Sequence, residues 1–266
     1  YQKCTGVRSY KPVPALDTHA VTQAAELINQ AKKPFIVWGQ GVILGSAEEE
    51  FKDVVEKSGI PAAWTILGLS ALPTNHPLNV GMVGMHGNYG PNLLTNECDL
   101  LIAIGMRFDD RVTGDLKTYA KQAKIIHLEL DPAEINKNVT VDVTLHADCK
   151  ISLQELNKRI KPKTYPDWIA RFDALDKIEY DKVIKSDLLP KKEGLTMGES
   201  VEMINKHSKN DAVIVTDVGQ HQMVACRYAK FSQSKSNVTS GGLGTMGFAL
   251  PAAIGAKMGA PHREVV

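Results

Sequence analysis

Short apolar runs alternate with amphipathic segments along residues 19–160, and this alternation predicts repeated strand–helix units. The runs Pro34–Trp38 and Asp99–Ile104 are almost continuously apolar, as expected for parallel strands that are covered on both faces. Further strands are expected at Ile60–Thr65, Lys124–Leu130 and Val141–His146. Units of this length predict an α/β fold, with a doubly wound parallel sheet and helices on both sides.

Helices are expected between these strands. Residues His19–Lys32 carry apolar side chains at the spacing of one helix face, and Asp148 is expected to cap a helix over 148–160. The segment Ser46-Ala47-Glu48-Glu49 has the pattern of a capping box, which predicts a helix that begins there and ends near Ser58.

The chain changes character after residue 160. Residues 161–194 hold three prolines and many charges, which indicate a linker with an amphipathic helix near Pro166–Lys182. A second α/β unit should follow, with a capping box at Thr196–Glu199, a strand at Ala212–Thr216 and a helix at Gly247–Gly259. Arg263–Val266 resembles the start of a strand with nothing to pair with, so we expect the natural chain to continue.

Composition and charge argue against a nucleic-acid-binding, a membrane-spanning or a secreted protein. With 31 Lys+Arg and 30 Asp+Glu the net charge is +1. A charge this small gives no electrostatic attraction to nucleic acid or to an anionic membrane. No apolar run approaches the roughly 20 residues that span a bilayer, and residues 1–4 do not begin a signal peptide. Scattered cysteines (Cys4, Cys98, Cys149 and Cys226) favour buried thiols in a reducing, cytoplasmic or organelle-matrix compartment.

Two glycine-rich turns are candidate phosphate sites. Gly39-Gln40-Gly41 follows a strand, but the next glycine, Gly45, comes one residue late for G-x-G-x-x-G, and a tight βα turn explains the pattern equally well. Gly242–Gly247 matches G-x-G-x-x-G, yet its preceding strand, Ser236–Thr239, would be short and polar. Because G-x-G-x-x-G is the pattern of dinucleotide-binding turns, a nicotinamide-dependent oxidoreductase is an alternative function.

Polar side chains gather where other strands should end. Arg107 and Arg111 follow the most apolar strand, and ligands of open α/β sheets bind at such carboxyl ends, so both are placed to meet an anion. A local ion-pair network with Asp109 and Asp110 is the competing interpretation. His86, in a glycine-rich loop, is by itself more often a hydrogen-bonded residue than a catalyst.

Five motifs in register carry a resemblance that covers essentially the whole chain: Gly39–Gly41, Gly84–Gly87, Gly105–Gly114, Asp217–Met223 and Ser240–Gly247. The set resembles the large catalytic subunit of the acetolactate synthase family, thiamine-diphosphate enzymes of branched-chain amino-acid biosynthesis. That family has a pyrimidine-binding, a central FAD-binding and a diphosphate-binding α/β domain. The resemblance implies a linker from the first domain (1–18), the central domain (19–160), a second linker (161–194) and the start of the third domain (195–266).

The resemblance also implies an activity. The family decarboxylates pyruvate and joins the two-carbon unit to pyruvate or 2-ketobutyrate, the first common step of valine, leucine and isoleucine biosynthesis. The cofactor-activating glutamate and the Mg²⁺ ligands would lie outside this chain, so we expect no metal site here and no activity from the 266 residues alone. A homodimer or tetramer in the cytoplasm, with a small regulatory subunit, is expected.

The resemblance assigns roles to residues near the thiamine diphosphate. Met246 would be the apolar wedge beneath the thiazolium, and the Gly244 carbonyl would accept a hydrogen bond from the aminopyrimidine. The diphosphate end would be lined by Val218, Gly219, Gln220 and His221. Arg111 would pair with the carboxylate of the second keto acid, and Met85 would favour an acceptor with an extra methylene.

FAD would be structural in this family, and the resemblance places it along the central domain. Its expected contacts are Gly39, Gly41, Thr65, Met85, His86, Gly105, Arg107, Asp109, Arg111, Glu129, Asp131 and Asp148. Two other classes stay open: a related thiamine enzyme such as a glyoxylate carboligase or pyruvate oxidase, and a non-enzymatic or nicotinamide-binding module.

Overall fold

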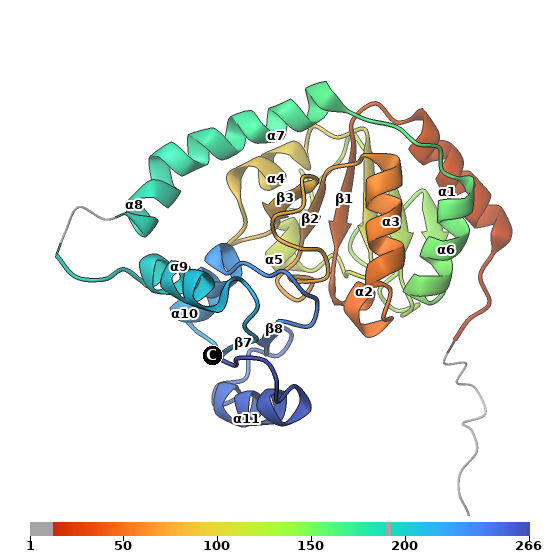
Figure 1. Ribbon diagram of the computed structural model, residues 1–266. Coiled ribbons are helices and arrows are strands. Elements are labelled where there is room, and N and C mark those ends of the chain that lie inside the picture. The colour runs from red at the N-terminus through yellow and green to blue at the C-terminus, as the bar shows by residue number, and fades with distance from the viewer. Residues whose placement is uncertain (1–12, 190–192) are drawn as a thin grey trace, which may run out of the picture.

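The computed structural model of the chain describes residues 13–189 and 193–266 (Figure 1). The expected N-terminal connection therefore lies mostly outside the described residues, as does Cys4. A six-stranded sheet occupies the centre, and a smaller unit with a two-stranded sheet lies beside it.

The central sheet is entirely parallel and has the strand order β3-β2-β1-β4-β5-β6. The predicted doubly wound sheet is thus confirmed, and its order reverses between β1 and β4. The strands are β1 (Pro34–Trp38), β2 (Ala62–Trp64), β3 (Asn79–Met82), β4 (Leu100–Ile104), β5 (Lys124–Leu128) and β6 (Val143–Leu145). Strand β3 was not expected from the sequence, and β2, β5 and β6 are shorter than predicted.

Helices cover both faces of the sheet because successive side chains of a strand point to opposite faces. From β1, Phe35 packs against Phe172, with ring centroids 5.3 Å apart, while Trp38 packs on the other face against Phe51 at 5.0 Å. All five residues of β1 and of β4 are buried, which explains their continuous apolar character.

The helices of the central part are α1 (Thr18–Gln30), α2 (Gln40–Leu44), α3 (Glu48–Ser58), α4 (Tyr89–Leu94), α5 (Asp110–Thr113) and α6 (Cys149–Arg159). Three of them, α1, α3 and α6, lie where the sequence predicts them, and the three shorter ones were not predicted. Asp148 caps α6 as expected, accepting from the amides of Lys150 and Ile151. The capping box at Ser46 is wrong: Ala47 is the N-cap residue and forms no side-chain cap bond, because Ser46 turns to φ +48° one residue earlier.

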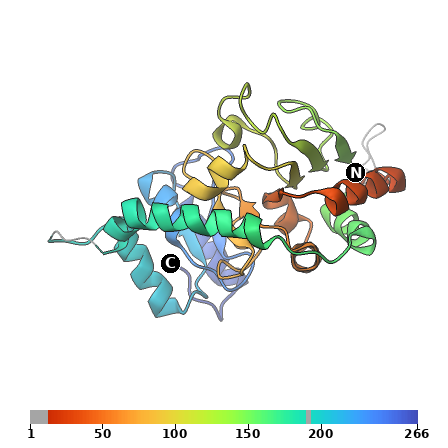
Figure 2. The same cartoon turned by 90° about the horizontal axis from the view of Figure 1, so that it is seen from above.

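The segment predicted as a linker is dominated by one long helix. It comprises α7 (Pro166–Glu179), the π-helical turn η1 (Tyr180–Ile184) and α8 (Lys185–Leu188), and so continues past the predicted end. Viewed from above, this helix runs across the molecule toward the C-terminal unit (Figure 2). The Trp168 indole donates to the carbonyl of Pro34 at 2.9 Å, which fixes α7 to the start of β1.

The second unit, called here the C-terminal unit (193–266), pairs β7 and β8 in parallel. Its elements are α9 (Met197–Ser208), β7 (Ile214–Thr216), α10 (Gln220–Tyr228), β8 (Asn237–Thr239) and α11 (Ala249–Gly259). The Thr196 capping box is present at the start of α9, as predicted. The expectation that Arg263–Val266 finds no partner is wrong, because Val265 forms a parallel bridge with Val213 beside β7.

The loop that follows β2 joins the two units. The amide of Thr74 donates to the carbonyl of Phe231 at 3.0 Å, and the Asn237 side chain donates to the carbonyl of Ile66 at 3.1 Å. These bonds place the C-terminal unit near the carboxyl edge of the central sheet. No helix within the described ranges is both long and apolar enough to cross a membrane.

Candidate functional site

The turns after β1 and β4 meet where the strand order reverses, the usual place for ligands in such sheets. The amide of Gly41 donates to the carbonyl of Gly105 at 2.8 Å. A Cβ on Gly41 would lie 2.5 Å from the Gly105 Cα, and a Cβ on Gly39 would lie 2.5 Å from the Gly105 carbonyl oxygen. The close packing of the two turns therefore accounts for glycine at all three positions.

Arg107, Asp109 and Arg111 follow this turn at the open edge of the sheet. Asp109 caps α5, accepting from the amide of Arg111 at 2.9 Å. Its other oxygen lies 3.5 Å from Nε of Arg107, and Arg111 lies 3.7 Å from Asp110. The ion-pair network that the sequence left open is therefore present. With the two arginine side chains 48% and 59% exposed, such pairs are worth only about 0–1 kcal/mol, so an anion can replace them.

Met85 and Arg111 come from different strand ends and are brought together. The amide of Met85 donates to the carbonyl of Arg111 at 2.7 Å. Gly84 has φ +104°, and a Cβ there would lie 2.7 Å from the same carbonyl, so only glycine permits this approach. The Met85 side chain is 67% exposed beside this contact, and the half-buried His86 follows it.

The remaining predicted residues of the central part also lie at strand ends. Thr65 is buried directly after β2, and its amide donates to Trp38. The carboxylates of Glu129, Asp131 and Asp148 each use one oxygen to accept bonds from nearby backbone amides. Burial raises the pKa of Glu129, although its two backbone hydrogen bonds oppose this effect.

His127, a fully buried residue of β5, was not predicted as a site residue. Its Nε2 lies 2.8 Å from the carbonyl of Met106 and 3.8 Å from a Glu129 oxygen. Burial lowers the pKa of His127, which favours the neutral ring. Its Nδ1 and the indole nitrogen of Trp64 are buried with no hydrogen-bond partner in the described part of the chain. A lone histidine within the apolar run Lys124–Leu128 was the available signal.

In the C-terminal unit, Asp217 ties the end of β7 to the glycine-rich turn. One oxygen accepts from the amide of Val218 at 3.0 Å and the other from the amide of Gly247 at 2.9 Å. These backbone hydrogen bonds, the one from Val218 first, lower the pKa of Asp217. Asp217 belongs to one of the five motifs, but its sequence context predicted no role for it.

The predicted thiamine residues flank this aspartate. Gly219 has φ +155° and precedes α10, whose first turn carries the exposed Gln220 and His221. Gly244 has φ +64°, and a Cβ there would meet nothing within 4 Å. Met246 is 81% exposed on the same turn. In contrast to the turns at the sheet, the backbone here has open space on its glycine side, which suits a bound group.

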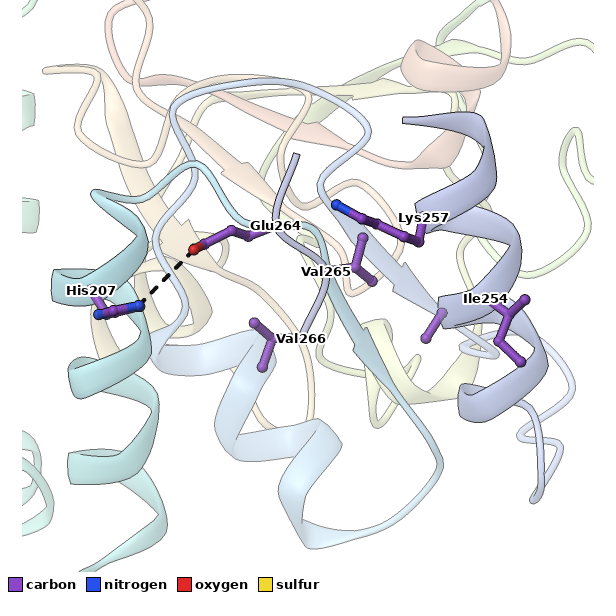
Figure 3. Close-up of a pocket in the computed structure, with 7 residues that line it drawn as sticks. His207, Ile254, Lys257, Glu264, Val265 and Val266 are labelled. Carbon is purple, nitrogen blue, oxygen red and sulfur yellow. Dashed lines mark ion pairs between the residues drawn. The ribbon is translucent and has the colours of Figure 1, made fainter. Parts of the chain in front are cut away.

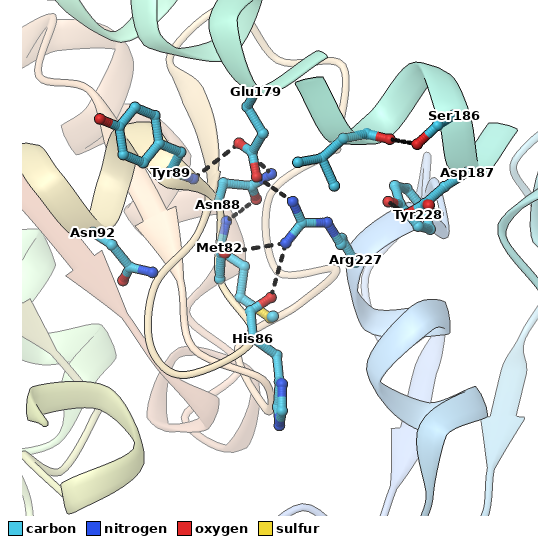
Figure 4. Close-up of polar contacts among 12 residues, drawn as sticks. Met82, His86, Asn88, Tyr89, Asn92, Glu179, Ser186, Asp187, Arg227 and Tyr228 are labelled. Carbon is cyan, nitrogen blue, oxygen red and sulfur yellow. Dashed lines mark hydrogen bonds and ion pairs between the residues drawn. The ribbon is translucent and has the colours of Figure 1, made fainter. Parts of the chain in front are cut away.

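Two residues outside the predicted set connect these regions. Arg227 of α10 donates to the carbonyls of His86 and Gly87 at 3.4 and 3.1 Å and pairs with Glu179 at the end of α7 (Figure 4). The loop that carries Met85 and His86 therefore lies against the helix that begins with Gln220 and His221. Buried charges on sequentially distant helices gave no signal in the sequence.

A surface hollow of about 640 Å³ lies elsewhere in the C-terminal unit (Figure 3). His207, Ile254 and Lys257 line it beside Val265 and Val266, and none of the predicted site residues does. Nothing in the described structure indicates an occupant. Across residues 13–189 and 193–266, no three His, Cys, Asp or Glu side chains are grouped as metal ligands.

Comparisons with known proteins match both parts of the chain. The family described as "Thiamine pyrophosphate enzyme, central domain" matches residues 21–156. The family described as "Thiamine pyrophosphate enzyme, C-terminal TPP binding domain" matches residues 217–266. The first match includes every strand of the central sheet, and the second includes the Asp217 and Gly244 turns.

Individual relatives carry a more specific name. The chain is 40% identical to a "Probable acetolactate synthase large subunit" of Methanococcus aeolicus, across 97% of the chain and 45% of the relative. It is 41% identical to an acetolactate synthase of Mycobacterium bovis and to an acetolactate synthase large subunit of Corynebacterium glutamicum, across 96% of the chain in each case. These matches cover 42% and 41% of the two relatives, so the chain spans less than half of their length.

Proposed function

The chain belongs to the thiamine pyrophosphate enzymes, and on that premise we propose that it is part of an acetolactate synthase large subunit. This protein would decarboxylate pyruvate and join the two-carbon unit to a second 2-keto acid, pyruvate or 2-ketobutyrate, in valine, leucine and isoleucine biosynthesis. The names of its relatives support the activity. The observation that carries the proposal is the contact between Met85 and Arg111 at the edge of the sheet.

Arg111 and Met85 would select the acceptor keto acid. A guanidinium can hold a carboxylate through two parallel hydrogen bonds, which fixes the angle at which the ketone is presented. The backbone bond from Met85 to Arg111 would hold an apolar side chain beside that carboxylate. One methylene contact is worth about 1–3 kcal/mol, so Met85 would give a modest preference for 2-ketobutyrate.

Thiamine diphosphate, when bound, would supply the electron sink for decarboxylation. Met246 would press an apolar, polarizable side chain against it, and the carbonyl of Gly244 would accept a hydrogen bond from its amine. Val218, Gly219, Gln220 and His221 would line the diphosphate, with the last two as donors. The open space at Gly244 and the 81% exposure of Met246 are consistent with these roles. Asp217 would orient the turn that carries them.

The carboxyl edge of the central sheet fits a flavin as well. Arg107 and Arg111 are exposed and would meet the anionic part of FAD, while Thr65, Met85, His86, Glu129, Asp131 and Asp148 would line the rest. The unpartnered indole nitrogen of Trp64, the residue before Thr65, is a buried donor that a ligand could satisfy. Gly39, Gly41 and Gly105 would contribute close backbone approach, and Asp109 would hold Arg107.

The remaining expectations belong to the same proposal. The domain division would be 1–18, 19–160, 161–194 and 195–266, and the whole protein would form a homodimer or tetramer in the cytoplasm with a small regulatory subunit. Mg²⁺ ligands would lie outside this chain. We therefore expect the 266 residues alone to be inactive, and pyruvate turnover by them would contradict that expectation.

The proposal is tested with the full-length natural protein, supplied with pyruvate and 2-ketobutyrate together. Arg111→Gln should raise the KM for the acceptor, and Met85→Ala should lower the 2-ketobutyrate preference by about tenfold. Met203→Ala removes another exposed methionine, 56% against 67% for Met85, from α9 and should change neither. Wild-type kinetics in the first two variants would refute the roles of Arg111 and Met85. Acetyl phosphate in place of acetolactate would favour a pyruvate oxidase.

A further inference from the structure

The buried stripe of α7 ends in a charge. Trp168, Phe172, Leu175 and Glu179 are all buried, and their spacing of four, three and four residues places them on one helix face. Three of them are large apolar residues, so an apolar residue would be expected in the fourth place. Glu179, at 5% exposure, instead carries a carboxylate, which is costly to bury unless it is paired and hydrogen-bonded.

Both oxygens of Glu179 are fully engaged. Oε1 accepts from the Arg227 guanidinium, while Oε2 accepts from the amide of Tyr89 at 2.9 Å and from the Asn88 side chain at 3.3 Å (Figure 4). The carboxylate thus joins three segments that are far apart in sequence: the end of α7, α10 and the start of α4.

Arg227 uses its other guanidinium nitrogen on the same loop. That nitrogen donates to the carbonyls of Gly87 and His86, directly after Met85. The planar fork of arginine can serve a carboxylate and these carbonyls at once, which a lysine ammonium cannot match in geometry. The side chain is only 19% exposed, so water competes little for these bonds.

The loop itself is internally rigid. Asn88 accepts from the amide of Met82 at 2.9 Å, and Asn92 bonds both the amide and the carbonyl of Gly84 at 2.8 Å. A displacement at His86 or Gly87 would therefore be passed on to Met85, whose amide holds Arg111.

We propose that Glu179 and Arg227 are positioning residues for the acceptor keto acid. They hold the Met85–Arg111 contact at a fixed place relative to α10, whose first turn carries Gln220 and His221. This inference rests on the proposed function, because those residues are the ones assigned to the acceptor and to the cofactor. Buried ion pairs can often be replaced by apolar residues without loss of stability, so stability alone does not explain a charged pair here. The bonds from Arg227 to the backbone of the Met85 loop are explained by a positioning role.

The test uses the full-length natural protein and the variants Arg227→Gln and Arg227→Lys. The readout is the ratio of the 2-ketobutyrate product to the pyruvate product when both acceptors compete. This ratio does not depend on how much enzyme is folded, so a purely structural defect leaves it unchanged. We expect the ratio to change by about tenfold in Arg227→Gln, since small misplacements of reacting groups cost up to about 100-fold.

A second readout is amide hydrogen exchange at Met85–Tyr89, which should become about tenfold faster in both Arg227 variants. Arg171→Gln is the matched control. Arg171 lies on α7, the helix of Glu179, and binds Glu97 through two bonds of 3.0 and 3.1 Å, but it is 53% exposed and faces no site loop. It should leave both readouts at their wild-type values.

The outcomes separate the two proposals. If the wild type forms both products and the Arg227 variants keep the wild-type ratio and exchange rates, the positioning role is wrong and the proposed function stands. If the wild type forms neither product, the proposed function fails, and the positioning of the substrate fails with it, even if loop exchange still responds. If Arg227→Gln does not fold, the product ratio and the exchange rates of Arg227→Lys decide whether the positioning role is correct.

Discussion

Glycine at position 41 has two possible explanations: close packing against Gly105, or contact with a bound cofactor. The substitution Gly41→Ala distinguishes between them. Gly41 lies in the short helix α2, and a Cβ there would lie 2.5 Å from the Cα and 2.9 Å from the carbonyl oxygen of Gly105. Both atoms belong to the backbone, so no side chain can turn aside to relieve the clash. The matched position is Gly255 in α11, where a Cβ would meet nothing within 4 Å.

The two substitutions should have opposite signs. Overpacking costs about 1–3 kcal/mol, and backbone neighbours favour the upper end of that range. Replacing glycine by alanine also lowers the conformational entropy of the unfolded chain, which stabilises the folded state by about 0.4–1 kcal/mol. Gly41→Ala should therefore destabilise the fold by about 2 kcal/mol, whereas Gly255→Ala should stabilise it by about 0.5–1 kcal/mol.

The assay is urea denaturation followed by circular dichroism, without and with FAD. A wild-type or higher unfolding free energy for Gly41→Ala without FAD would refute the packing argument. If the variant then lost stability only relative to the FAD-bound wild type, the glycine would be explained by flavin contact instead.

Three further predictions concern burial. Trp168→Ala should lower the unfolding free energy by about 3–5 kcal/mol in the same assay, because it removes a buried ring that fixes α7. In Cys4→Ser protein, iodoacetamide should label the described thiols only after denaturation, because burial raises the pKa of Cys98 and of Cys226 to about 12; rapid native labelling would contradict this. The lowered pKa of His127 means that the unfolded state takes up more protons, so stability is lost as the pH falls through about 6.5. His127→Asn should therefore show a smaller loss between pH 7.5 and 5.5, and an equal loss would exclude His127 as the source.

The central sheet was predictable because its inner strands are buried on both faces. Pro34–Trp38 and the β4 run carry an unbroken apolar signal, and both became the middle strands. Strand β3 escaped prediction because Asn79–Met82 is mostly half-buried and contains a glycine. Its pairing is decided by the neighbouring β2 rather than by its own sequence.

Parts of the site were predictable for a different reason. Residues at the ends of apolar strands converge on one edge in any parallel sheet, so Arg107 and Arg111 could be placed from the sequence. Glu179 and Arg227 could not, because their pairing depends on how α7 and α10 pack. The failed capping box at Ser46 has a similar cause, since its positive φ belongs to the turn after α2.

The central claim is the activity of the whole protein. Acetolactate formation from pyruvate should be measured with the full-length natural chain, thiamine diphosphate and Mg²⁺, with FAD present and omitted. We predict acetolactate that depends on FAD. Acetolactate formed without FAD would support the proposed reaction but refute the FAD contacts assigned along the central sheet. No acetolactate under either condition would contradict the proposed function and remove the role given to Arg111.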